Sequence, residues 1–153
     1  MSFAIALHIL SATIWVGGMF FAHFMLKPSS NEILQPPLRL ALWVAVFKRF
    51  FLWVWLVSIT IIVSGYWMIF GVFGGMANIG TSVHIMSLMG LIMLVIFSFI
   101  FFKPYQALKT AVKEKNYPLA GQKMNSIRLL VTANLVLGIC TIIIASAGKY
   151  WTI

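Results

Sequence analysis

The stretch VHIMSLMGLIMLVIFSFIFF, from Val83 to Phe102, contains no charged side chain. A helix needs about 20 predominantly apolar residues to cross the hydrocarbon core of a bilayer, so this stretch predicts a transmembrane helix. Three further stretches have the same character: Phe3–Leu26, Phe50–Phe73 and Leu129–Ala147. We therefore expect an all-α integral membrane protein whose four spans form a transmembrane four-helix bundle, with residues 1–153 as one domain.

The composition agrees with this class. Only 8% of the 153 residues are charged, whereas soluble domains carry about 25%. A net charge of +9 would suggest nucleic acid for a soluble protein. Here the basic residues flank apolar stretches, so we expect the lipid bilayer and no nucleic acid as partner. The acidic residues, Glu32 and Glu114, lie between spans, which excludes paired-carboxylate catalysis within the membrane.

The distribution of basic residues predicts the orientation. All but one of the 11 lie in the first and third connections. They are Lys27, Arg39, Lys48, Arg49, Lys103, Lys109, Lys113, Lys115, Lys123 and Arg128. The positive-inside rule assigns these connections to the cytoplasm. We therefore expect both termini to be periplasmic, in a multi-pass protein of the bacterial inner membrane.

The cytoplasmic connections have their own patterns. Leu38–Phe47 follows a Pro-Pro pair and is predicted to form a short amphipathic segment at the membrane interface. The third span is expected to continue into water as a helix over Pro104–Lys115. The sequence Asn116-Tyr117-Pro118 then indicates a turn and a new helix start.

Two of the three histidines open spans that should run in the same direction. His8 lies near the start of the first span and His84 in the first turn of the third, so both belong to the outer half of the membrane. An imidazole in the bilayer is a functional-site candidate. Two at similar depth predict axial ligation of one b-type haem between the helices. The alternative is that each histidine only hydrogen-bonds across a helix interface.

His23 cannot share that iron, because it follows His8 by about 22 Å along a helix axis. It could pair with a methionine, bind a copper ion, or extend toward the interface. The nine methionines raise a copper alternative for the protein as a whole, because thioethers and imidazoles suit Cu(I). The methionines form no tight sequence cluster.

Four other residues are candidates to contact a cofactor. Trp15 shares a helix face with His8, and Gly65 would permit close approach of helices or of a flat group. Asn134 should face inward and hydrogen-bond across helices, because a free amide is costly in hydrocarbon. Lys149 follows the fourth span at the level where a haem propionate would emerge.

Four segments resemble a known membrane family, the small copper resistance protein D (CopD-like) proteins. They are Leu7–Gly18 (LHILSATIWVGG), Ser64–Trp67 (SGYW), Val83-His84 and Asn134–Gly138 (NLVLG). The chain is also similar to the HemJ-type protoporphyrinogen oxidases. The first resemblance implies copper handling; the second implies b-type haem with His8 as a ligand. An arginine typical of the HemJ pattern is missing after Trp15, and Ile85-Met86 replaces its His-Ile-Lys pattern.

From these observations we expect a membrane b-type cytochrome that binds one haem through His8 and His84 for one-electron transfer. A quinone or a periplasmic protein would be the redox partner. The alternatives are a copper-binding or copper-transport protein, HemJ-like porphyrinogen oxidation, and a non-catalytic scaffold. The sequence leaves the existence of a homo-oligomer open.

Overall fold

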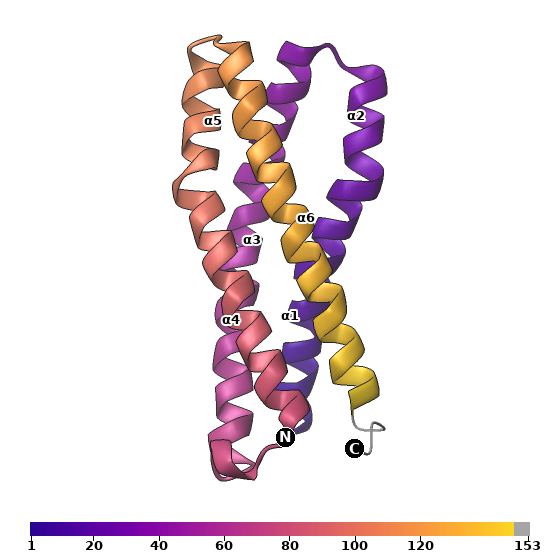
Figure 1. Cartoon of the computed structure of the whole chain (residues 1–153), viewed down its shortest axis with the longest axis vertical. Coiled ribbons are helices and arrows are strands. Elements are labelled where there is room, and N and C mark those ends of the chain that lie inside the picture. The colour runs from indigo at the N-terminus through magenta and orange to yellow at the C-terminus, as the bar shows by residue number, and fades with distance from the viewer. Residues whose placement is uncertain (149–153) are drawn as a thin grey trace.

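The computed structural model describes residues 1–148, and these contain helices and no strand. Four helical rods are long and apolar enough to cross a membrane: Ser2–Ile33, Pro36–Gly71, Thr81–Lys113 and Tyr117–Ala147. They run up and down alternately (Figure 1). The N-terminus and the end of the last rod lie at one end of the molecule, and two tight turns lie at the other. The prediction of an all-helical protein with four membrane-length helices is confirmed.

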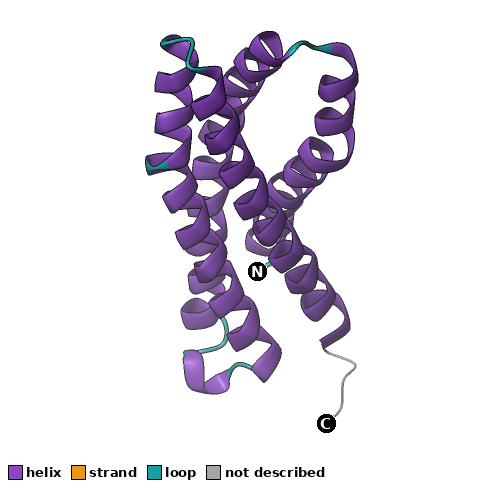
Figure 2. Ribbon diagram, turned by 45° about the horizontal axis from the view of Figure 1, so that its top comes forward, coloured by secondary structure: helices purple, strands orange, loops and turns teal. Residues whose placement is uncertain are grey.

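Two of the rods are interrupted. The first consists of α1 (Ser2–Phe21), the π-helical η1 (Ala22–Leu26) and α2 (Lys27–Ile33). The second is α3 (Pro36–Gly71), which a short 3₁₀ turn, η2 (Met76–Asn78), follows. The third consists of α4 (Thr81–Phe102) and α5 (Pro104–Lys113), and the fourth is α6 (Tyr117–Ala147). The first rod bends near its π-helical segment (Figure 2), as expected where an extra residue enters a helical turn.

Proline and asparagine set the helix starts at the tight turns. Pro36 begins α3 after an extended Gln35, because a proline disfavours helical geometry in the residue before it. Asn116 caps α6: its side-chain oxygen accepts a hydrogen bond from the Leu119 backbone N–H at 3.2 Å. Pro118 occupies the first turn of α6, as the sequence predicted.

The rods are longer than a bilayer requires. The 36 residues of α3 span about 54 Å, whereas the hydrocarbon core is about 30 Å thick. The excess lies at the end with the two tight turns, where α2, α5 and the beginnings of α3 and α6 meet (Figure 1). Ten basic residues belong to this half of the bundle or to its connections.

The prediction of a separate interfacial segment over Leu38–Phe47 is wrong. These residues are part of the continuous helix α3. Leu40, Trp43 and Phe47 are buried in the main core, because α5 and α6 also extend to this level and cover them. The apolar face of α3 therefore packs against α5 and α6 and not against lipid headgroups. The predicted helix after the third span is present as α5.

The core is tightest in this same half of the molecule. Phe51 stacks on Phe47 with ring centroids 5.0 Å apart, and it meets Tyr105 edge-on at 4.9 Å. Leu108 of α5 and Ile127 of α6 are fully buried. The opposite half, toward the N-terminus, holds fewer buried side chains and contains a cavity of about 310 Å³.

Glycines bring α1 close to two neighbours. A β-carbon at Gly138 of α6 would lie 2.7 Å from Val16 Cγ2 and 3.2 Å from Met93 Cε. A β-carbon at Gly18 would overlap the ring of Phe50 on α3. Small residues allow close packing where lipid supplies no hydrophobic driving force between helices. These contacts set the spacing of α1 against α3 and α6.

Gly138→Ala should therefore destabilise the bundle. Val16 is β-branched and cannot turn away freely, so overpacking should cost about 1–3 kcal/mol, partly offset by about 1 kcal/mol of helix propensity. Gly121→Ala is the matched control in the same helix, since nothing lies within 4 Å of its added β-carbon. Thermal unfolding in detergent, followed by circular dichroism, should show a lower midpoint for Gly138→Ala alone. Equal midpoints for the two variants would contradict the close α1–α6 contact.

Candidate functional site

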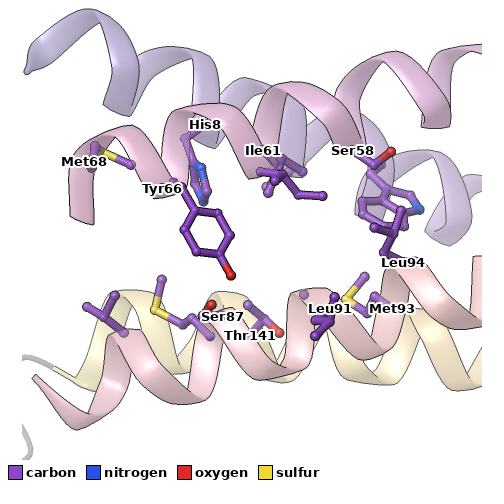
Figure 3. Close-up of a pocket in the computed structure, with 18 of the residues that line it drawn as sticks. His8, Ser58, Ile61, Tyr66, Met68, Ser87, Leu91, Met93, Leu94 and Thr141 are labelled. Carbon is purple, nitrogen blue, oxygen red and sulfur yellow. The ribbon is translucent and has the colours of Figure 1, made fainter. Parts of the chain in front are cut away.

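A cavity of about 310 Å³ lies between α1, α3, α4 and α6 in the half of the bundle that holds the N-terminus. Its walls are mostly apolar, with few polar groups. Figure 3 shows the rings of His8 and Tyr66 pointing into it from one side, and Ser87 and Thr141 on the other. This combination of apolar walls and few converging polar groups is typical of ligand sites.

His8 is held by a hydrogen bond across the α1–α3 interface. Its Nδ1 lies 3.0 Å from the hydroxyl oxygen of Ser64. That hydroxyl also donates to the Thr60 carbonyl at 2.6 Å. A serine hydroxyl has one hydrogen; when it is given to this carbonyl, Ser64 accepts from His8 and Nδ1 carries the proton. In that tautomer the lone pair of His8 Nε2 is available to a ligand or a metal ion.

Gly65 makes this arrangement possible. A β-carbon at this position would lie 3.2 Å from Cε1 of the His8 ring and 3.6 Å from Nδ1. Any larger residue would push the imidazole away from α3. The sequence identified Gly65 as a site residue but missed its neighbour Ser64. The sequence signal that could have identified Ser64 is its position directly before Gly65, a small polar residue beside a small one.

Three methionines also line the cavity: Met68 from α3, and Met86 and Met93 from α4. They come from two helices and were not singled out as a group in the sequence. Met68 lies near the end of the cavity that holds His8, and Met93 lies toward the other end, beside Leu94 (Figure 3). No carboxylate lies among the lining residues in the described part of the chain.

His84 is not part of this cavity. Val83, Met86, Ser87 and Gly90 of α4 line it, and they recur at the spacing of one helix face. His84 lies outside that face, and its side chain is exposed. His84 is thus absent from the cavity that His8 lines, and haem ligation by the pair His8 and His84 has no support here.

The other candidate residues fall in different places. Trp15 is buried and lines the cavity, and it meets Phe97 edge-on with ring centroids 6.2 Å apart. Asn134 is buried beside the cavity rather than in its wall. Its amide nitrogen donates to the Met93 carbonyl on α4 at 3.1 Å, which is the expected bond across helices. Its Oδ1 has no partner. Lys149 lies outside the described residues.

His23 belongs to a second, much smaller cavity near the opposite end of the spans. It is part of the π-helical segment, and its Nδ1 lies 3.2 Å from the hydroxyl oxygen of Thr132 on α6. That hydroxyl also donates to the Arg128 carbonyl at 2.8 Å, and in that arrangement it accepts from the protonated Nδ1 of His23. No group of three or more His, Cys, Asp or Glu side chains suited to a metal ion occurs among residues 1–148.

Comparison with known proteins connects this fold to one family. The family model described as copper resistance protein D (CopD) matches residues 44–147, well over half of the chain. The match includes Ser64, Gly65 and the three cavity methionines, whereas His8 lies before it. Searches of curated proteins and of solved structures returned no significant match. The chain is a multi-pass membrane protein that belongs to the copper resistance protein D family.

Proposed function

We propose that this protein binds Cu(I) in the cavity between α1, α3, α4 and α6, as part of copper handling at the bacterial inner membrane. The observation that carries this proposal is the lining of the cavity: His8 and three methionines are among the residues of its largely apolar walls. Membership of the CopD family supports the choice of metal.

The donor chemistry favours Cu(I) over harder ions. Thioether sulfur and neutral imidazole are suitable ligands for Cu(I), whereas Mg²⁺, Ca²⁺ and Mn²⁺ prefer carboxylate and carbonyl oxygen. Ser64 would serve as the outer partner that fixes the ring of His8, because metal-binding histidines commonly donate their second ring N–H to such an acceptor. The free Nε2 of His8 would be the metal-binding atom.

The charge distribution also supports entry of a cation from the N-terminal end. The ten basic residues of the first and third connections belong to the opposite end of the bundle. We assign that end to the cytoplasm by the positive-inside rule, so the cavity lies in the periplasmic half. A Cu(I) ion approaching from the periplasm would therefore meet fewer basic residues than one approaching from the cytoplasm.

Direct titration tests the proposal. The purified protein in detergent should compete with a chromophoric Cu(I) chelator for about one ion per chain. His8→Ala should weaken Cu(I) binding by more than about 100-fold. This is the upper range for the loss of a residue that only hydrogen-bonds to a metal ligand. His84→Ala is the control, because this histidine lies outside the cavity. Loss of affinity in both variants, or in neither, would remove His8 from its proposed role.

Ser64→Ala should weaken Cu(I) binding by about 10- to 100-fold while leaving the fold intact. The methyl group cannot accept the Nδ1 proton, so the ring of His8 loses its orientation. Ser58→Ala is a close control. Ser58 lines the same cavity on the same helix, but its hydroxyl donates only to the backbone carbonyl of Trp55 in that helix. Equal chelator competition by the two variants would contradict the orienting role of Ser64.

A b-type haem is the second candidate, and one observation favours it. The apolar cavity is much larger than a single ion needs, and His8 offers one axial ligand with a free Nε2. Haem supplies one-electron chemistry when bound. A red preparation with sharp α and β bands after dithionite reduction would favour haem. A colourless protein that binds copper stoichiometrically would favour the copper site.

A further inference from the structure

The second cavity is lined by residues that have no role in the proposed copper site. It has a volume of about 20 Å³ and lies between the bend of the first rod, α3 and α6. Ala22, Trp43, Phe47, Met124, Ile127 and Val131 supply apolar walls, and His23, Lys27 and Arg128 supply the polar edge. Its volume suits a water-sized group such as one phosphate oxygen.

The positive charge at this cavity is uncompensated. Arg39 of α3 lies close enough to Arg128 for the two guanidinium groups to repel one another. Neither acidic residue of the chain, Glu32 or Glu114, lines the cavity. Like charges gathered without a counterion favour an anion from outside the chain.

Arg128 also has an unused donor inside the protein. Its Nε is buried and has no hydrogen-bond partner. A buried unsatisfied donor of a charged group costs at least about 1–3 kcal/mol. An acceptor oxygen that entered the cavity would remove this cost, and guanidinium groups match phosphate geometry well.

The position along the spans identifies the source of that oxygen. Lys27 directly follows the first apolar stretch, and Arg128 directly precedes the fourth. Both therefore lie at the level of the headgroups on the basic side of the membrane. Beyond the point where the first rod crosses α6, the two diverge toward this end (Figures 1 and 2). Basic pockets between transmembrane helices on the cytoplasmic side are suited to anionic lipid headgroups.

We propose that Lys27 and Arg128 bind the phosphate group of an anionic phospholipid, with one phosphate oxygen directed toward Arg128 Nε. Trp43 and Phe47 are buried in the core, so only the phosphate oxygen enters the cavity and the rest of the lipid lies outside it in the bilayer. A free phosphate ion shares the same chemistry but lacks the acyl chains that the bilayer would hold beside the site. The lipid would hold the bent first rod against α3 and α6 at a site separate from the metal.

The test uses the full chain, purified in mild detergent and mixed with equal amounts of phosphatidylglycerol and phosphatidylcholine that carry identical acyl chains. Native mass spectrometry then gives the ratio of the two lipids retained. The wild type should retain phosphatidylglycerol preferentially. Lys27→Gln and Arg128→Gln should each lower the ratio about fivefold, the effect of one cation near a membrane surface.

The controls separate this site from general surface charge. Lys113→Gln removes one charge from an exposed position on α5 that does not line the cavity, and it should leave the ratio unchanged. Arg128→Lys should preserve most of the preference. Circular dichroism checks that each variant is folded. If Arg128→Gln is unfolded, the test relies on Lys27→Gln, which changes a half-buried position.

Three results would overturn the proposal. One is an equal loss of preference in Lys27→Gln and Lys113→Gln, which would indicate non-specific attraction. Another is no preference in the wild type. The third is displacement of phosphatidylglycerol by excess inorganic phosphate, which would assign the site to the free ion.

Discussion

Hydrocarbon offers no hydrogen-bonding partner, and this constraint shapes every polar contact within the spans. His8 pairs with Ser64 and His23 with Thr132, and Asn134 donates to the carbonyl of Met93. In both histidine pairs, the hydroxyl gives its own hydrogen to a carbonyl of its own helix. In that arrangement each imidazole donates through Nδ1, which leaves the lone pair of Nε2 available. The hydrogen bonds that hold the helices together are thus compatible with an available ring nitrogen at each of the two sites.

One half of the bundle is closely packed, and the other half contains the cavity. Toward the basic end, aromatic rings of α3 and α4 interlock with α5, and fully buried Leu108 and Ile127 close the core. Toward the N-terminal end, the side chains between α4 and α3 leave a cavity of about 310 Å³. A rigid base with a looser opposite half is a suitable arrangement for binding a ligand without losing the fold.

The two histidine sites differ in their surroundings, and this difference assigns them different chemistry. His8 faces methionine sulfur and apolar walls. His23 lies beside Lys27 and Arg128, which would repel a metal cation and attract an anion. The prediction that His23 is an alternative copper ligand stays untested, but its cationic neighbours make it the less suitable of the two histidines.

Composition and hydrophobic period were sufficient to predict four membrane-length helices, their turns and the inward position of Asn134, because these depend on local sequence and on the bilayer. The extent of the rods depended on tertiary contacts: Leu40, Trp43 and Phe47 looked interfacial until α5 and α6 covered them. The structure gives no support for the pairing of His8 with His84, and the reason is the direction in which each side chain leaves its helix. Depth along a helix follows from residue number, but the direction of a side chain is set by how each helix turns against its neighbours. The contact of Ser64 with His8 and the presence of the methionines in the cavity wall depend on that rotation, so only the folded bundle could identify them.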